Sequence, residues 1–558
     1  MRKLFILSLL SLCLTSDYAK AQTPFNTLDS ININNINAAV LVHGDMWWNP
    51  VTQIEHCNFP ASAPTNINLA GAIWMSGYDA GNNLHIAAQT YRQIGNDYWP
   101  GPLDPSGALT YTTSQKWAKI WKVNGTDVQY FNLLPTHTTA NTPPAILTWP
   151  GKGNTYAQGN GGAALTITDD MAPFVDLNGN GIYEPLLGEY PDFIGEQALW
   201  WVFSDNGPTH SETNGTPLDV EIHAMAYAYS RGTLIDNVIY YDYTIINKSV
   251  NNYHNSRFAL WDMVEIGCFY DDYIGFDSTW RMGISYNANY YDATICIGPP
   301  KHYNIPPVVG STMIVLPGDA GSTYVPAGSF TYYNNDLTVL GYPISDTQYN
   351  NFMHAKFKDG QHFTNDFAGP GIPSSAYGSG PDCNYVYPGD PSDSTQWSEC
   401  VCNDPHSYRH FVLTSNDFTL NIGSTQHVVM ALITTDTGAG GCPNISFSGI
   451  KTVADTAWYI YHNPLIPLHL SVANKTMAIN SVTIYPNPTH DKLYIEDAAQ
   501  NMDEATIIIY NSIGQVINVA MNKNGQRLEL DISHLPVGLY NALYRNGTVQ
   551  MSTKFLKE

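Results

Sequence analysis

A regular alternation of apolar and polar residues runs through residues 479–558 and restricts this segment to β-structure. Successive side chains of a strand point to opposite faces, so a period of two describes strands with one buried face. Turn-forming residues separate the runs at Pro486–Pro488, Asn511–Gly514, Asn524–Gly525 and Pro536–Gly538. About six or seven strands in so short a segment are typical of a small β-sandwich. The strands are expected around Ile484, Leu493 and Ile495, Ile507 and Ile509, and Leu528 to Ile532.

The rest of the 558-residue chain is also predicted to be mainly β, as a multi-domain β-sandwich body with few helices. Hydrophobic residues make up 44% and charged residues 13% of the chain, a composition that argues against disorder. Short apolar runs bounded by Gly, Pro and Asn indicate many strands, and we expect strands at Val238–Asn247, Phe418–Ile422 and His427–Thr434.

One helix is expected near the end of this body. Ile450, Val453, Ala457, Ile460 and Tyr461 fall on one face at helical spacing. Ser448 is available as the N-cap, and Asn463-Pro464 ends the pattern.

These patterns divide the chain into five parts. Arg2 and Lys3, the apolar run Leu4–Leu14 and the A-x-A site Ala19–Ala21 predict a cleaved signal peptide at residues 1–21. The other parts are an N-terminal β-rich domain at 22–224, a second β-rich domain at 225–464, a linker at 465–478 and the sandwich at 479–558.

Charge and cysteine content limit the environment of the mature chain. The formal charge of −24 disfavours nucleic acid and anionic membrane surfaces as partners. No segment after the signal peptide is long and apolar enough for a transmembrane helix. Seven cysteines remain after cleavage, so at least one is free or pairs between chains; disulfides and buried thiols both fit, and the connectivity stays open.

Short motifs in the terminal sandwich follow one another in a specific order. They include Ile509-Tyr510-Asn511 and Asp531-Ile532-Ser533. Because of the order and spacing of these motifs, the segment resembles the type A C-terminal sorting domain of the type IX (Por) secretion system. The residues that match its main motifs are Tyr485, Pro486, Asn487, Pro488, Gly514, Gln515, Gly538, Tyr540 and Lys554.

This resemblance implies a route and a location for the protein. It implies Sec-dependent export to the periplasm, translocation by the type IX machinery, and then release or attachment to surface lipopolysaccharide. Short sequence segments of the body, such as His85–Arg92 and Gly195–Trp201, are similar to segments of large exported proteins with the same tail. This similarity implies no activity.

A calcium-binding loop is predicted at residues 176–184, which follow the D-x-[DN]-x-[DN]-G pattern. Asp176, Asn178 and Asn180 supply alternating oxygen ligands, Ile182 its carbonyl, and Glu184 a carboxylate. The twelfth position of an EF-hand is here Leu187, and the possible replacements for the missing acid are Glu189 and Asp192. An Asn/Gly-rich turn without metal is the alternative.

A second acidic cluster is formed by Asp262, Asp271, Asp272 and Asp277, together with Glu265. Five acids within 16 residues repel one another unless they are solvated or bridged by a cation. Calcium ligation by these carboxylates and solvated loop acids are both consistent with the pattern.

No metalloprotease helix, nucleophile elbow, P-loop or dinucleotide fingerprint occurs in the sequence, so no catalytic residue is assigned. We therefore expect a secreted or cell-surface protein with a calcium-stabilised binding, adhesion or structural body. Aromatic residues that stack on sugars would allow a glycan ligand; the favoured alternative is that Trp and Tyr fill the sandwich cores. A protein ligand is also open. The alternative is a secreted hydrolase of polysaccharide or protein, which needs only two carboxylates that meet in space.

Overall fold

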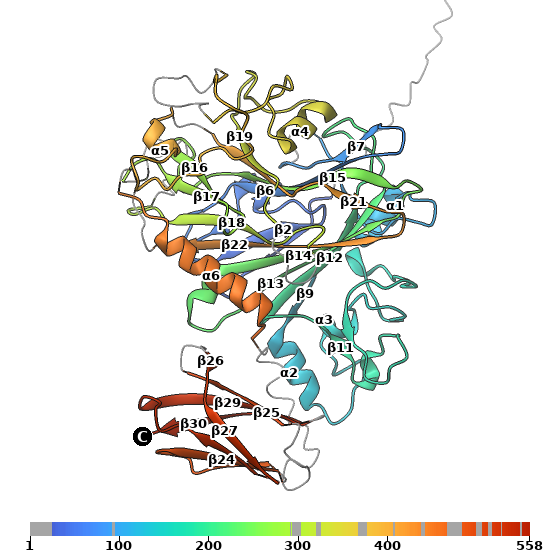
Figure 1. Cartoon of the computed structure of the whole chain (residues 1–558). Helices are drawn as coiled ribbons and strands as arrows, with labels where there is room; N and C mark the ends of the chain where they lie inside the picture. Colours follow the sequence, from blue (N-terminus) through green and yellow to red (C-terminus); the bar gives the residue numbers. More distant parts are fainter. Residues whose placement is uncertain are drawn as a thin grey trace, which may run out of the picture.

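The computed structural model describes residues 25–91, 95–290, 292, 303–319, 325–365, 377–405, 408–436, 441–442, 444–465, 482–497, 505–511, 516–525, 527–546 and 549–558. The expected signal peptide at 1–21 and residues 466–478 of the expected linker lie outside these ranges. The described chain is mainly β, as predicted, and its sheets are antiparallel (Figure 1).

A nine-stranded sheet forms the centre of the body, in the order β16-β17-β18-β22-β14-β13-β12-β8, with β9 also paired to β12. The predicted strand Val238–Asn247 is β14, and the predicted strand His427–Thr434 lies within β22. The bounds are β8 Trp99–Pro100, β9 Trp121–Asn124, β12 Gln197–Ser204, β13 Val220–Ala228, β14 Val238–Asn247, β16 Asp272–Asp277, β17 Met282–Asn287, β18 Val308–Val315 and β22 Thr425–Thr435.

A six-stranded sheet covers one face of this central sheet, in the order β19-β20-β15-β6-β7, with β21 paired to β15. Tyr241 and Met430 of the central sheet share a buried cluster with Trp74, Trp261 and Leu413 of the second sheet. The bounds are β6 Ala70–Tyr78, β7 Leu84–Ala87, β15 Tyr253–Met263, β19 Ser329–Tyr333, β20 His410–Thr414 and β21 Phe418–Leu420.

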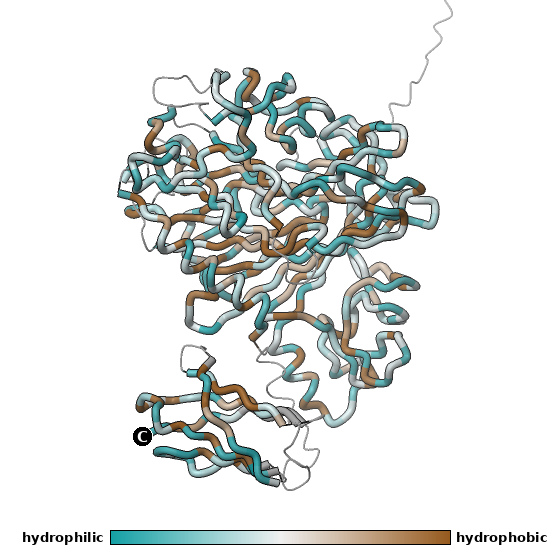
Figure 2. Tube along the Cα trace, in the orientation of Figure 1, coloured by the Kyte–Doolittle hydropathy of each residue, from teal (hydrophilic) through white to brown (hydrophobic). Residues whose placement is uncertain are grey.

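Helix α6, Ser448–His462, packs against the opposite face of the central sheet (Figures 1 and 2). Its buried side chains include Ile450, Val453, Ala457 and Ile460, as the helical spacing predicted. The Tyr240 hydroxyl of β14 donates to the Ala457 carbonyl at 2.8 Å. The expected N-cap is wrong by one residue, because Ser448 is the first helical residue and Phe447 is the cap.

Shorter elements connect these layers. The helices are α1 Tyr111–Trp117, α2 Gly125–Leu133, α3 Pro144–Leu147, α4 Asp346–Met353 and α5 Glu399–Cys402, and the 3-10 turns are Asn160–Gly162, Pro185–Leu187 and Leu234–Asn237. The short strands are β1 Leu28–Ile31, β2 Asn37–Leu41, β3 Trp48–Asn49, β4 Ile54–Glu55, β5 Cys57–Asn58, β10 Phe174–Val175 and β11 Tyr190–Pro191.

The expected boundary between residues 224 and 225 falls inside a strand of the central sheet. Both residues belong to β13, and the neighbours of β13 are β12 and β14. One sheet therefore joins the two regions that are expected, from the sequence, to be separate domains.

The terminal segment forms two four-stranded sheets around a core of its own, which includes Leu493, Ile495, Leu528 and Leu530. The sheet orders are β23-β24-β28-β27 and β26-β25-β29-β30. The bounds are β23 Val482–Tyr485, β24 Lys492–Asp497, β25 Thr506–Tyr510, β26 Val516–Ile517, β27 Ala520–Asn524, β28 Arg527–Asp531, β29 Gly538–Asn546 and β30 Val549–Lys557.

Candidate functional site

The loop at residues 176–184 is closed by its own backbone and side chains. The Asp176 carboxylate accepts hydrogen bonds from the amides of Gly179 and Gly181, each at 2.7 Å. These amides lower the pKa of Asp176, so this carboxylate is ionised at neutral pH. Gly179 and Gly181 both have φ of 74°, a conformation that glycine adopts without strain.

The two asparagines of the loop point toward the same carboxylate. Asn178 Nδ2 and Asn180 Nδ2 donate to Glu184 Oε2 at 2.9 and 2.7 Å. Their own Oδ1 atoms accept from the amides of Asn180 and Ile182. The structure thus brings four of the five predicted ligands, Asp176, Asn178, Asn180 and Glu184, into one exposed loop.

A buried acid supports this loop from the protein side. Glu189 accepts from the amides of Leu177 at 3.1 Å and Glu184 at 2.7 Å. Burial raises the pKa of Glu189, and the nearby charges of Asp176 and Glu184 raise it further. Three acidic groups therefore gather at one loop, where a cation would relieve their repulsion.

The second predicted cluster is divided between separate places. Asp262 is buried on β15, where Asn68 Nδ2 and Ser311 Oγ donate to its Oδ2 at 3.2 and 2.8 Å. Asp277 lies at the far end of β16 from Asp272 and pairs with Lys451 at 3.0 Å. At about 3.3 Å per residue, the five residue steps between Asp272 and Asp277 span about 17 Å, too far to share one ion.

Next to Asp271 the structure brings a further acid that is not part of the predicted cluster. Asp292 lies beyond β17, and its carboxylate approaches that of Asp271 within 4.8 Å. Asp271, Asp272 and Asp292 are each at most 2% exposed. No local pattern in the sequence marks Asp292, because strands β16 and β17 separate it from the other two.

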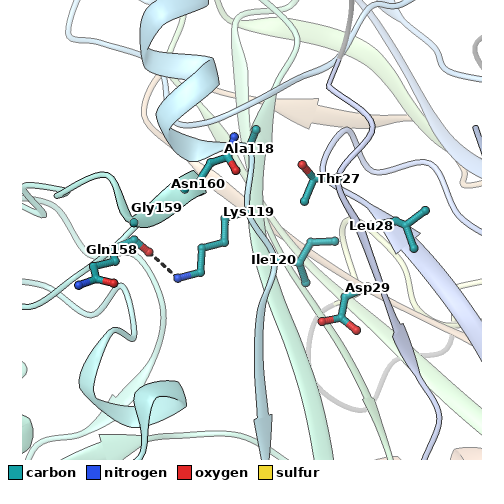
Figure 3. Close-up of a pocket in the computed structure, with 11 residues that line it drawn as sticks. Thr27, Leu28, Asp29, Ala118, Lys119, Ile120, Gln158, Gly159 and Asn160 are labelled. Atoms are coloured by element: carbon teal, nitrogen blue, oxygen red, sulfur yellow. Dashed lines mark hydrogen bonds between the residues drawn. The ribbon is translucent and has the colours of Figure 1, made fainter. Parts of the chain in front are cut away.

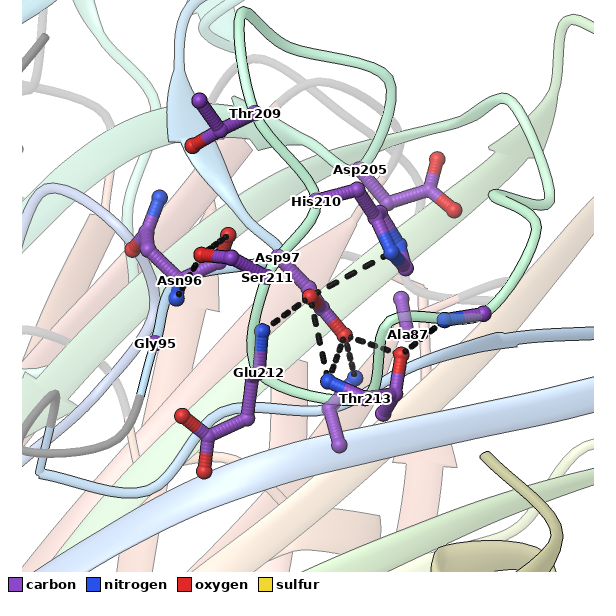
Figure 4. A network of polar contacts seen from close by, with 12 residues as sticks. Ala87, Gly95, Asn96, Asp97, Asp205, Thr209, His210, Ser211, Glu212 and Thr213 are labelled. Atoms are coloured by element: carbon purple, nitrogen blue, oxygen red, sulfur yellow. Dashed lines mark hydrogen bonds and ion pairs between the residues drawn. The ribbon is translucent and has the colours of Figure 1, made fainter. Parts of the chain in front are cut away.

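Another network of buried polar groups centres on Asp97 (Figure 4). Its carboxylate accepts from the Glu212 amide at 2.8 Å and from the Thr213 hydroxyl at 2.7 Å. His210 Nδ1 lies 3.3 Å from the same carboxylate, and burial lowers the pKa of this imidazole. Burial raises the pKa of the nearby Glu212 to about 7. These buried groups connect segments of the core, and a polymeric substrate cannot reach them.

A deeply buried ion pair joins α5 to Arg409, the residue just before β20. Arg409 Nη2 lies 2.6 Å from Glu399 Oε1 and 3.2 Å from Asp404 Oδ2. The Tyr332 and Tyr387 hydroxyls donate to the same oxygen of Asp404 at 3.2 Å. This network also is structural, because its three charged side chains are at most 2% exposed.

Two pockets of the body are each lined by a single acid. One pocket of about 380 Å³ is lined by Lys119, Asp29 and the glycine-rich turn Gly159–Gly162 (Figure 3). Lys119 Nζ donates to the Gln158 carbonyl at 2.7 Å, and Asp29 Oδ1 lies 3.3 Å from Lys122 Nζ. Asp29 is the single acid among these lining residues, so this pocket lacks the carboxylate pair of a glycosidase.

A second pocket, of about 340 Å³, carries more titratable groups. It is lined by Tyr78, Asn82, His254, Asn255, His354 and Asp417. Burial and the adjacent Arg257 lower the pKa of His354 to about 4, which leaves its imidazole neutral. Arg257 Nε donates to Asp417 Oδ1 at 2.5 Å.

The aromatic residues mostly fill the cores. Eight tryptophans, among them Trp74, Trp200 and Trp261, are at most 2% exposed. The interpretation of the aromatic residues as a platform for glycans therefore has no support from these eight.

The cysteines that the structure describes fall into two groups. Cys400 and Cys442 form a disulfide, and Cys268 is also disulfide-bonded. Cys57 and Cys402 are free thiols.

The predicted sorting residues connect the two ends of the terminal sandwich. Asn487 Nδ2 donates to the Lys554 carbonyl, and Asn487 Oδ1 accepts from the Leu556 amide, both at 2.9 Å. Tyr540 is buried, stacks on Phe555 and donates its hydroxyl to the Pro536 carbonyl. Pro486 and Pro488 follow cis peptide bonds, and Gly538 begins β29. The predicted motif residues Gly514 and Gln515 lie outside the described residues.

Comparison with known families identifies this segment. Residues 483–558 match the secretion system C-terminal sorting domain, the type IX family that the motifs indicated. Secretion or display at the cell surface, and interaction with the type IX machinery, follow from this match. Within the described ranges no helix is both long and apolar enough to cross a membrane.

The body is not identified in the same way. No match to the chain is found among curated proteins. A solved polysaccharide lyase is similar at 8% identity with a TM-score of 0.17, over 60% of this chain and 34% of the lyase. The chain thus spans about a third of the lyase, and a similarity this low does not indicate an activity.

Proposed function

We propose that the type IX pathway delivers a calcium-stabilised binding or structural protein to the cell surface or the medium. The main support for calcium binding in this proposal is the convergence of Asp176, Glu184 and Glu189 at one loop. Oxygen atoms at alternating positions of such a loop are the ligands that calcium prefers. At millimolar calcium, a site with a Kd of about 10⁻⁵ M adds about 2.7 kcal/mol to the free energy of unfolding.

Four other acids of the body have surroundings that favour a structural role over a catalytic one. The carboxylates of Asp97, Asp262, Glu399 and Asp404 are buried in hydrogen-bonded networks inside the body. A polymer chain cannot reach groups that are this deeply covered. The alternative, an exported hydrolase, rests on the pocket of Tyr78, His254, His354 and Asp417, which offers groups for acid-base chemistry.

Thermal unfolding of the mature chain with calcium and with EDTA tests the loop. We expect calcium to raise the melting temperature and Asp176→Ala to reduce this rise. Asp169→Ala is the matched control, because Asp169 is an exposed acid just before the loop. Equal calcium dependence in the wild type and Asp176→Ala would exclude the loop as a calcium site.

Incubation of the same protein with polysaccharides and proteins tests whether the body binds a polymer or hydrolyses it. Retention on a polymer without release of soluble products supports a binding body. Product release that Asp417→Asn or His354→Gln abolishes would instead establish the hydrolase alternative.

A further inference from the structure

The pocket at the end of α1, shown in Figure 3, lies in a part of the body with few acids. Residues 105–126 and 153–168 supply most of its lining and contain no Asp or Glu, in a chain that has 48 acids. Lys116, Lys119 and Lys122 fall within the first of these stretches. The local potential is therefore expected to attract anions, although the chain as a whole is acidic.

Lys119 carries the single ammonium group among the lining residues. Its Nζ donates to the Gln158 carbonyl at 2.7 Å and lies 5.1 Å from the ring centroid of Trp121. Among the described residues no carboxylate pairs with Lys119, because Asp29 pairs with Lys122 at 3.3 Å. Burial lowers the pKa of Lys119 to about 8, so the ammonium is protonated at neutral pH with only neutral groups to stabilise it. A bound anion would supply the missing counter-charge.

The glycine-rich turn lies on one side of Lys119 and leaves space for a ligand (Figure 3). A Cβ at Gly159 would lie 2.0 Å from the Lys116 carbonyl oxygen, so only glycine allows the turn to pack against the end of α1. Gly161 and Gly162 have φ of 60° and 79°, and a Cβ on either would meet no atom within 4 Å. The amides of Asn160 and Gly161 donate to no described backbone group outside their own turn. Turns with left-handed residues and such amides form concavities that bind anions.

The other side of the pocket offers surface for a sugar ring. Ile120 is 7% exposed and Leu28 is half-buried, and both contribute apolar atoms to the lining. Thr27 adds a hydroxyl group that can donate or accept a hydrogen bond. A few polar groups placed around an apolar surface are typical of small-ligand pockets, and the volume of about 380 Å³ lies within their usual range.

We propose that this pocket binds an acidic sugar residue, with its carboxylate against Lys119 and the glycine-rich turn and its ring against Leu28 and Ile120. This inference rests on the proposed binding role of the body and names the class of ligand. One lysine without an acidic partner selects a single anionic group, and the net charge of −24 disfavours a dense polyanion. The ligand is therefore a saccharide whose acidic residues are isolated.

Calorimetric titration of the mature full-length chain tests the proposal. The probes are a glucose oligosaccharide that ends in one glucuronic acid and its neutral counterpart. We expect the acidic probe to bind about tenfold more tightly, the effect of one charge-assisted hydrogen bond. Lys119→Met should remove this preference. Lys152→Met is the matched control and should keep it, because Lys152 pairs with Asp170 and does not line the pocket.

The pH dependence of the titration provides a second readout that a merely structural lysine would not change. The preference for the acidic probe should decline as the pH rises above about 8, because the ammonium of Lys119 loses its proton. Lys119→Arg keeps its charge at all these pH values, so it should retain the preference at about pH 9.

Equal affinity for the two probes, no binding of either probe, or a preference that Lys119→Met leaves unchanged would overturn the proposal. Acetate has the carboxylate without the ring and should bind more weakly than the acidic probe; equal binding would overturn the assignment to a sugar. The proposed binding role is tested separately, because retention of a polymer that Lys119→Met leaves unchanged would refute this pocket and still support a binding body.

Discussion

Removal of the Arg409 guanidinium should destabilise the body more than removal of any partly exposed arginine. Arg409 Nε donates to Glu399 Oε1 at 2.7 Å and Nη1 donates to Asn334 Oδ1 at 2.8 Å. The carboxylates of Glu399 and Asp404 are as buried as the guanidinium. Arg409→Met keeps most of the side-chain volume but leaves both acids without their cation.

The expected loss in free energy of unfolding is about 3–5 kcal/mol, the usual cost of leaving a buried charge without its partner. Arg257→Met is the matched control. Its partner Asp417 is 47% exposed, so solvent screens the pair and the expected loss is about 1 kcal/mol or less.

Urea unfolding followed by tryptophan fluorescence isolates the body in the intact chain. All 13 tryptophans lie between Trp47 and Trp458, and none lies in the sorting domain. The reasoning is refuted if Arg409→Met costs less than about 1 kcal/mol, or no more than Arg257→Met.

Three further predictions concern a crosslink, a buried acid and the sorting domain. Cys442→Ser opens a disulfide that spans 42 residues and should cost up to about 4 kcal/mol; equal urea midpoints for this variant and the wild type without reductant would contradict this. The folded protein holds a proton on Glu212 up to about pH 7, whereas the unfolded chain releases it near pH 4.5, so stability should fall between these values. Glu212→Gln should reduce that fall in urea titrations at a series of pH values, and an unchanged pH slope would rule out this role for Glu212. Deletion of residues 479–558 should leave the protein in the periplasm, and immunodetection of the truncated chain in the medium at wild-type levels would argue against it.

Local patterns predicted the elements that bury one face. Leu493, Ile495, Leu528 and Leu530 alternate and are all buried in the sorting domain, and the helical spacing of Ile450 to Ile460 describes the buried face of α6. The expectation for Phe418–Ile422 is only partly confirmed. Phe418 and Leu420 are buried, but Ile422 lies beyond the end of β21 and is 55% exposed.

Contacts between distant segments could not be read from such patterns. Asp292 reaches Asp271 only because β16 and β17 pair, and Arg409 reaches Asn334 only because β19 and β20 pair. The predicted ligands of the loop at 176–184 were recognisable because they alternate within nine residues. Asp277, by contrast, was grouped wrongly with Asp272, since closeness in sequence does not bring together the two ends of a strand.

The position of β22 in the central sheet has a consequence for how the body folds. This strand lies between β14 and β18, and its His427 contacts Asp242 across a sequence separation of 185 residues. Pairings of such high contact order form late, because the entropy cost of closing a long loop comes before any stabilising contact can form. Before β22 pairs with them, β14 and β18 each have an unpaired edge, and unpaired strand edges bind strands of other chains. The body is thus expected to fold slowly and as one unit, and to need protection from aggregation during its export.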